Sequence, residues 1–127
     1  KPNLSEIKAG MNITFNEDNI EEVKQASEKL RTLLDVEGVL LTLSEKGICI
    51  NTKNVFLHTP ASKRNIVDVS GAGDTVISVA ALSLASKMDF QPLSVLSSLA
   101  GGIVCEDVGV VPINKEKLLA EAIKFIH

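Results

Sequence analysis

The chain has 127 residues, of which 45% are hydrophobic and 23% charged, and this composition suits one domain with a packed core. The formal net charge is −3 and the 13 basic residues form no block, which argues against nucleic acid as the main partner. The longest uncharged run, residues 75–86, is shorter than the roughly 18 apolar residues of a membrane span. We therefore expect a cytoplasmic protein that binds neither nucleic acid nor a membrane.

The cysteines and histidines do not suggest a metal site. Cys49 and Cys105 lie far apart, without a C-x-x-C motif or a neighbouring histidine. This pattern is typical of two reduced, buried thiols rather than of a disulfide framework or a zinc site. His58 and His127 are distant from each other in the sequence and form no cluster.

The first part of the chain predicts one long helix and three short strands. Apolar residues recur at helical spacing after Asn19, which we expect to cap the helix together with Glu22, and Gly38 is expected to end it. Three apolar runs bounded by polar turns predict the strands, at residues 39–43, 48–50 and 55–59. The first run is continuous, as in a strand buried on both faces, so we expect a β-hairpin attached to a parallel sheet.

The second part of the chain predicts three helices. An extended segment, residues 66–69, leads into a helix at residues 74–87, and a second helix runs from about Pro92 to about Cys105. The last helix follows its cap, Asn114, and has an apolar stripe that we expect to lie in the core. The stripe consists of Leu118, Leu119, Ala122, Ile123 and Ile126. Helices and strands in this order predict the α/β class, with helices on both faces of a sheet.

A Gly-rich turn at the start of the helix at residues 74–87 carries a single carboxylate, Asp74. The first amides of a helix lack intrahelical partners and carry positive potential, and Gly71 and Gly73 let the backbone approach a bulky anion. A carboxylate beside a bound anion is repelled by it, but it is well placed to take a proton from a hydroxyl that attacks phosphorus. The pattern therefore fits phosphoryl transfer to an alcohol.

The same residues also fit an ordinary helix start with Asp74 as its N-cap. The bare G-x-G-D pattern leaves this alternative open, because it is neither a Walker A loop nor the dinucleotide fingerprint G-x-G-x-x-G.

The sequence D-V-S-G-A-G-D-T-V at residues 68–76 resembles the signature of the ribokinase-like (PfkB-type) carbohydrate kinases, D-[TV]-[TS]-G-A-G-D-[TS]-F. In that family the final aspartate is the catalytic base and the G-A-G amides form the anion hole. The resemblance thus assigns the base to Asp74 and the hole to Gly71, Ala72 and Gly73. Val76 stands where most members have Phe, and G-D-T-V-I is similar to the bacterial heptose 7-phosphate kinases of lipopolysaccharide precursor synthesis.

Two further stretches match motifs of the family. P-N-L-S-E resembles its N-x-x-E motif, which implies that Asn3 and Glu6 act near magnesium and the phosphates; the alternative is a helix start capped by the same residues. T-L-S-E-K-G-I resembles its T-x-G-x-x-G turn along the nucleotide. Thr42 and Gly47 match that turn, whereas Ser44 stands where Gly is usual, and a plain hairpin turn explains the stretch equally well.

The resemblance also implies an adenine pocket and a monovalent-cation loop. Ser98 and Gly101 occupy the segment that lines the adenine pocket in the family, although small residues there also permit close helix packing. Asp68 and Ser70, together with carbonyl groups near Val104 and Gly109, match positions that bind a monovalent cation such as K⁺ in some members.

The resemblance covers essentially the whole chain but only about the C-terminal half of the family's chain. It implies that residues 1–127 are the C-terminal part of a PfkB-type kinase domain, a ribokinase-like three-layer αβα sandwich, without the N-terminal sugar-binding half and its lid. The implied function is phosphoryl transfer from ATP, with Mg²⁺, to a sugar or sugar phosphate, with heptose 7-phosphate as the favoured substrate. The alternative is a non-catalytic nucleotide-binding or interaction module, either a degenerate kinase or one half of a split kinase.

Two expectations follow for the chain by itself. Without a sugar-binding half it should be inactive as a kinase. Its sheet should expose apolar strand surface at residues 39–43, which favours a homodimer or other self-association.

Overall fold

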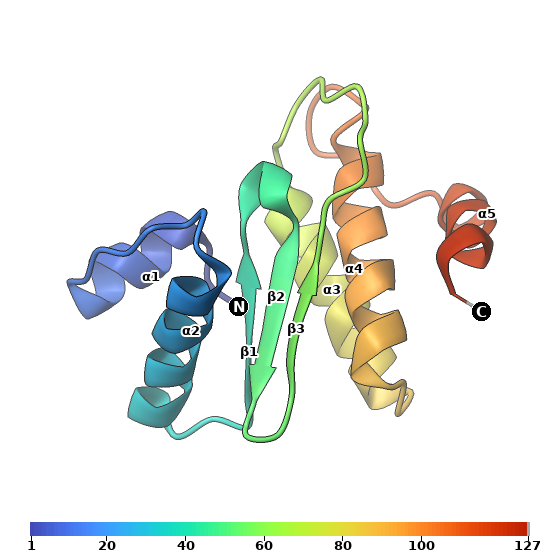
Figure 1. Ribbon diagram of the computed structural model, residues 1–127. Coiled ribbons are helices and arrows are strands. Elements are labelled where there is room, and N and C mark those ends of the chain that lie inside the picture. Colours follow the sequence, from blue (N-terminus) through green and yellow to red (C-terminus); the bar gives the residue numbers. More distant parts are fainter. Residues whose placement is uncertain (127) are drawn as a thin grey trace. The chain divides into compact units, whose positions relative to one another are not determined.

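The computed structural model describes residues 1–126 and divides into two units, Lys1–His58 and Thr59–His127 (Figure 1). His127, which was expected to form no cluster with His58, lies outside the described residues. None of the helices in the described part of the chain has the length and apolarity to cross a membrane.

The sheet has the order β1-β2-β3, with β1 at Gly38–Thr42, β2 at Ile48–Thr52 and β3 at Phe56–Thr59. All of it except Thr59 belongs to the first unit. β1 and β2 pair in antiparallel fashion, so the predicted hairpin is confirmed. Outside the strands, Asn3 and Thr42 form an isolated parallel bridge.

The helix before β1 is present but has different boundaries from those predicted. α2 spans Ile20–Leu34, and the Asn19 side chain accepts from the amides of Glu21 and Glu22, as expected of a cap. The capping box is wrong, because the Glu22 carboxylate accepts from the amide of Asn16 at 2.6 Å instead. Gly38 does not end the helix: Asp35 does so in the left-handed conformation (φ 52°), which a short polar side chain tolerates.

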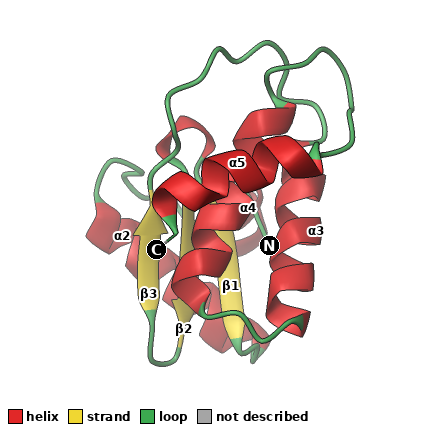
Figure 2. Ribbon diagram, turned by 90° about the vertical axis from the view of Figure 1, so that its right-hand side faces the viewer, coloured by secondary structure: helices red, strands yellow, loops and turns green. Residues whose placement is uncertain are grey.

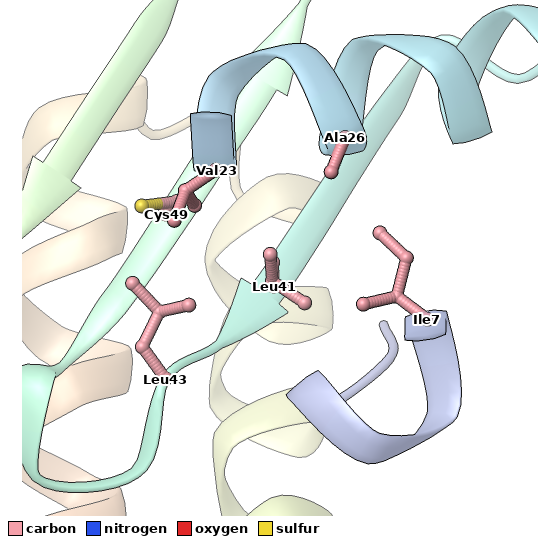
Figure 3. Close-up of a cluster of buried hydrophobic side chains, with 6 residues drawn as sticks. All are labelled: Ile7, Val23, Ala26, Leu41, Leu43 and Cys49. Atoms are coloured by element: carbon pink, nitrogen blue, oxygen red, sulfur yellow. The ribbon is translucent and has the colours of Figure 1, made fainter. Parts of the chain in front are cut away.

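The core of the first unit forms where α2 packs on β1 and β2. One face of α2, the shorter helix α1 (Leu4–Met11) and the two strands contribute its side chains, which Figure 3 shows converging. The cluster comprises Ile7, Val23, Ala26, Leu41, Leu43 and Cys49. Because Val39, Leu41 and Leu43 are buried, the prediction that residues 39–43 expose apolar strand surface is wrong.

The second unit contains α3 (Ala72–Ala85), α4 (Phe90–Val104) and α5 (Lys115–Phe125), and α3 lies along α4 (Figure 2). α3 starts two residues before Asp74, the predicted start, because the amide of Thr75 already bonds to the carbonyl of Gly71 at 3.1 Å. Residues 66–69 form no strand; the amides of Val67 and Asp68 both donate to the carbonyl of Cys105 instead.

α5 begins after Asn114, whose side chain accepts from the amide of Lys117, so the predicted cap is confirmed. Most of its predicted apolar stripe lies outside the core: Leu119 and Ile123 are 58% and 63% exposed. Only Ala122 of this helix is buried, since α5 meets α4 along that narrow line.

Both cysteines are free and buried, as the sequence predicts. Burial raises the pKa of the Cys49 thiol to about 12, and burial also raises the pKa of Cys105. Because the thiolate is the reactive form, we expect a disulfide-exchange reagent at neutral pH to modify either thiol only as fast as the chain opens. The absorbance of the released aromatic thiolate measures this rate. Immediate reaction of the folded chain, at the rate seen in concentrated guanidinium chloride, would contradict the prediction.

Candidate functional site

The Gly-rich turn in front of α3 requires a glycine at position 71. Gly71 has φ 76° and ψ 0°, in the left-handed region, and it occupies the N-cap position of α3 without any side-chain cap. A Cβ atom at this position would lie 3.0 Å from Cγ1 of Val110. Both the backbone conformation and the nearby Val110 side chain therefore disfavour larger residues at position 71.

The amides of this turn are only partly engaged. The amide of Ala72 donates to the carbonyl of Val69 at 3.2 Å. Within residues 1–126, no hydrogen bond engages the amides of Gly71, Gly73 or Asp74. The last of these is a donor that the sequence analysis missed, because it placed the helix start at Asp74 rather than at Ala72. Unpaired amides at the positive end of a 14-residue helix can hold an anion.

Asp74 is the only acidic residue in the first turn of α3. Its side chain is exposed, and its carboxylate makes no hydrogen bond within residues 1–126. Gly71, not Asp74, is the N-cap, so the interpretation of Asp74 as an ordinary N-cap is wrong. Asp74 therefore presents an accessible proton acceptor directly beside unpaired amides.

The segment before the turn is fixed by Asp68. Its Oδ1 atom accepts from the Ser70 amide (2.9 Å) and hydroxyl (2.6 Å), and its Oδ2 atom accepts from the Gly109 amide at 2.8 Å. These bonds, the Ser70 hydroxyl foremost, lower the pKa of Asp68. The structure thus brings Asp68, Ser70 and Gly109 together, as the predicted cation loop requires. In the described chain no group of three or more His, Cys, Asp or Glu side chains could hold a metal ion.

In the first unit, Asn3 and Glu6 cap α1 reciprocally. The Glu6 amide donates to Asn3 Oδ1, and the Asn3 amide donates to Glu6 Oε2, both at 2.8 Å. The capping interpretation of P-N-L-S-E is therefore confirmed, whereas its role near magnesium stays a prediction. The Thr42 amide donates to the carbonyl of Pro2 at 3.0 Å, so the N-x-x-E motif and the first residue of the nucleotide turn lie side by side.

The turn after β1 has a backbone suited to glycine at two places. A 3₁₀ helix, η1 (Ser44–Lys46), forms its centre, and Gly47 has φ 95° and ψ −137°. Ser44 also has positive φ (56°), which explains why the family usually has glycine there. The amide of Leu43 donates to the carbonyl of Gly47 at 2.8 Å, which closes the turn. His58 Nε2 lies 2.8 Å from the Lys46 carbonyl oxygen and supports the turn, a structural role for this histidine.

On α4, Gly101 is a packing residue. It is buried, and a Cβ atom there would lie only 2.6 Å from Cγ2 of Val76 on α3. The close-packing interpretation of this residue is therefore confirmed. The adenine pocket assigned to Gly101 and to Ser98, which is half-buried, stays a prediction. Val76, which stands where most members have Phe, and Gly101 are thus neighbours in space.

Comparison with known proteins gives a family and a set of relatives. The profile of the family described as "pfkB family carbohydrate kinase" matches residues 1–117. The bifunctional protein HldE of Alcanivorax borkumensis is 36% identical over 118 residues, or 92% of this chain. That of Methylococcus capsulatus is 38% identical, also over 92% of this chain. The chain spans 24% of the length of each of these relatives, about a quarter.

Solved structures share the fold. Ribokinase from Thermotoga maritima matches with a TM-score of 0.79 and 28% identity, over 97% of this chain and 41% of that chain. Phosphofructokinase-2 from Escherichia coli, in complex with substrates and products, matches with a TM-score of 0.88 and 16% identity, over 99% of this chain and 40% of that chain. The predicted ribokinase-like α/β fold is therefore confirmed.

The left-handed Ser44 generates a stability prediction. The left-handed conformation destabilises the folded state by about 1–2 kcal/mol for a non-glycine residue, and glycine avoids this cost. Glycine also increases the entropy of the unfolded chain, which lowers the free energy of unfolding by about 0.5–1 kcal/mol. We expect Ser44→Gly to raise the free energy of unfolding by up to about 1 kcal/mol, measured by urea denaturation. Glu45→Gly, in the same turn but without positive φ, should lower it by about 0.5–1 kcal/mol. Equal losses for both variants would show that Ser44 is unstrained.

The contact between Val76 and Gly101 generates a second prediction. Gly101→Ala adds a methyl group where there is no room, which costs about 1–3 kcal/mol, against a gain in helix propensity of about 1 kcal/mol. We therefore expect Gly101→Ala to lower the free energy of unfolding in the wild-type background. In the Val76→Ala background, Gly101→Ala should instead raise the free energy of unfolding, because the Val76 side chain no longer fills the space beside position 101. The same sign in both backgrounds would rule out this contact as the reason for the glycine.

Proposed function

Because this chain belongs to the pfkB family of carbohydrate kinases, we propose that it supplies the phosphate- and nucleotide-binding part of an ATP-dependent sugar kinase. The observation that carries this proposal is the start of α3, where the unpaired amides of Gly73 and Asp74 adjoin the exposed Asp74 carboxylate. An anion and a hydroxyl that attacks it need these two kinds of group at one place. Gly71 and Ala72 shape the turn that presents them.

In the proposed reaction, the Asp74 carboxylate takes the proton of a sugar hydroxyl. The hydroxyl oxygen bonds to the terminal phosphorus of ATP, and the bond from that phosphorus to the bridging oxygen of the nucleotide breaks. Negative charge gathers on the transferred phosphoryl oxygens, where the amides of Gly73 and Asp74 can stabilise it. These amides are held by the backbone, so little reorganisation is needed as the charge develops.

The proposal assigns magnesium to Asn3 and Glu6. Glu6 is exposed, and its Oε1 atom makes no hydrogen bond within residues 1–126, so the donor chemistry fits a hard cation that keeps some of its waters. Magnesium, when bound, neutralises phosphate charge. Thr42, Ser44 and Gly47 are proposed to lie along the nucleotide, on the strength of the resemblance to the family's turn; of the three, Ser44 is exposed.

The remaining assignments rest on the resemblance to the family. Ser98 and Gly101 are proposed to line the adenine pocket. Asp68 and Ser70 are proposed to contribute to a monovalent-cation loop, and the joint anchoring of Asp68 to Ser70 and Gly109 supports this.

For the sugar we propose a heptose 7-phosphate. The support is the dipeptide Val76-Ile77 after G-D-T, together with the identity of 36–38% to two proteins named HldE. The phosphate acceptor is then a hydroxyl of a sugar that already carries one phosphate. A panel of sugar phosphates and free sugars as acceptors distinguishes this substrate from others.

The role of Asp74 predicts the effect of Asp74→Asn in the complete kinase chain that carries these residues. Loss of the proton acceptor should lower turnover by about 10²–10⁴-fold, while the affinity for ATP and the melting temperature stay nearly unchanged. A coupled assay for ADP and a nucleotide titration measure these quantities. The matched control is Asp89→Asn, which alters an aspartate at the start of α4 and should leave turnover within about threefold.

Two results would contradict the proposal. Turnover of Asp74→Asn within about threefold of wild type would remove Asp74 as the base. A wild-type protein that binds nucleotide but transfers phosphate to no sugar would favour the alternative, a non-catalytic nucleotide-binding module.

A further inference from the structure

Arg64 is the most buried charged side chain of the second unit's ion pairs, with only 6% of it exposed. Its guanidinium binds Glu121 of α5 with two parallel hydrogen bonds, Nη1 to Oε1 at 3.0 Å and Nη2 to Oε2. Nη1 also donates to Glu106 Oε1 at 3.0 Å, just beyond the end of α4. Glu106 pairs in addition with Lys117, which is 44% exposed. A buried charge with this many partners is held in one place.

The backbone of α4 makes room for Arg64. A Cβ atom at Gly102 would lie 2.5 Å from Arg64 Nε and 2.9 Å from its Cδ atom. The arginine side chain therefore crosses α4 against bare backbone. Arg64 itself lies in the loop that leads into the Gly-rich turn, seven residues before Gly71.

The loop after Arg64 is fastened to the same end of α4. The amides of Val67 and Asp68 donate to the carbonyl of Cys105, at 2.8 and 3.1 Å. Cys105 is the neighbour of Glu106 in the sequence, so the side-chain and backbone anchors meet within one turn. Asp68 then fixes Ser70 through its carboxylate, and Gly71 follows directly. A continuous set of bonds thus connects Arg64 to the turn.

We propose that Arg64 is a positioning residue for phosphoryl transfer, which fixes the loop at residues 64–70 and thereby the amides of Gly73 and Asp74. The inference rests on the proposed function for its catalytic consequence, but not for its structural part. Arginine is required because its planar fork binds Glu121 through two atoms while a third contact reaches Glu106. Each partner favours the charged form of the other: the hydrogen bond to Glu121 raises the pKa of Arg64, and the hydrogen bond from Arg64 lowers the pKa of Glu121.

The structural part is tested by amide NMR spectra of the isotope-labelled chain. Arg64→Gln and Glu121→Gln should both move the amide resonances of Gly71 and Gly73, because the loop loses its anchor. Arg64→Lys is the second variant, in case Arg64→Gln does not fold, because it keeps the positive charge. A lysine cannot form the two parallel hydrogen bonds to Glu121. We expect it to move the same resonances. The matched control is Lys117→Gln, which removes an exposed partner of Glu106 and should leave the turn unchanged.

The catalytic part is tested by steady-state kinetics of the complete kinase chain. A misplaced turn should weaken interactions made in the transition state, so kcat should fall about 10- to 100-fold in Arg64→Lys while the KM for the sugar stays within about twofold. Lys117→Gln should retain wild-type kcat. A purely structural role would lower the melting temperature of Arg64→Lys and leave kcat per folded molecule unchanged.

The outcomes separate this inference from the proposed function. Resonance changes confined to α5, or kcat of Arg64→Lys within about twofold of wild type, would overturn the positioning role and reduce Arg64 to a fastener of α5. Absence of phosphoryl transfer by the wild type would overturn the proposed function instead. The spectra would still decide whether Arg64 positions the Gly-rich turn.

Discussion

Gly71 turns the chain into α3 by adopting a left-handed conformation against Val110, and the arrangement of the candidate site depends on this turn. With φ at 76°, the carbonyl of Gly71 accepts the amide of Thr75 and starts the helix at Ala72. The amides of Gly73 and Asp74 are then left in the first turn without partners, and the Asp74 side chain is exposed beside them. A residue with a side chain at position 71 would have to relax both its backbone and Val110, and the amides would move with it.

The ionic and backbone contacts around residues 64–70 convert a loop without regular secondary structure into a defined approach to that turn. Loops hold their shape only when their polar groups have partners, and here these partners are concentrated at Cys105, Glu106 and Gly109. Asp68 connects the loop to the turn, because its carboxylate accepts from the amide of Ser70 through one oxygen and from the amide of Gly109 through the other. Because these hydrogen bonds lower its pKa, Asp68 stays charged in the folded chain to a lower pH than an ordinary aspartate does.

Local sequence signals predicted the features that depend on local chemistry. The caps Asn19 and Asn114, the hairpin of β1 and β2, and the glycines of the turn follow from side-chain type and spacing alone. The resemblance to carbohydrate kinases, now supported by the family match over residues 1–117, came from one nine-residue signature. Features decided by tertiary contacts were missed or wrong. The exposure of Leu119 and Ile123 and the contact of Arg64 with Glu121 depend on which elements meet, and helical periodicity does not contain that information.

α4 contacts both segments that flank the Gly-rich turn. At Gly101 its bare backbone admits Val76, which sets how closely α3 approaches, and one position later Gly102 admits Arg64, which anchors the loop. The next turn contributes the carbonyl of Cys105 to the same loop. The two consecutive glycines therefore contact the two segments that flank the turn: Gly101 packs against the helix after it, and Gly102 packs against the loop before it. Val76, which stands where most members of the family have Phe, lies at this contact. A larger residue at position 101 would press on Val76 and force α3 and α4 apart at this contact. Because α3 is one continuous helix from Ala72, we expect such a displacement to reach Asp74.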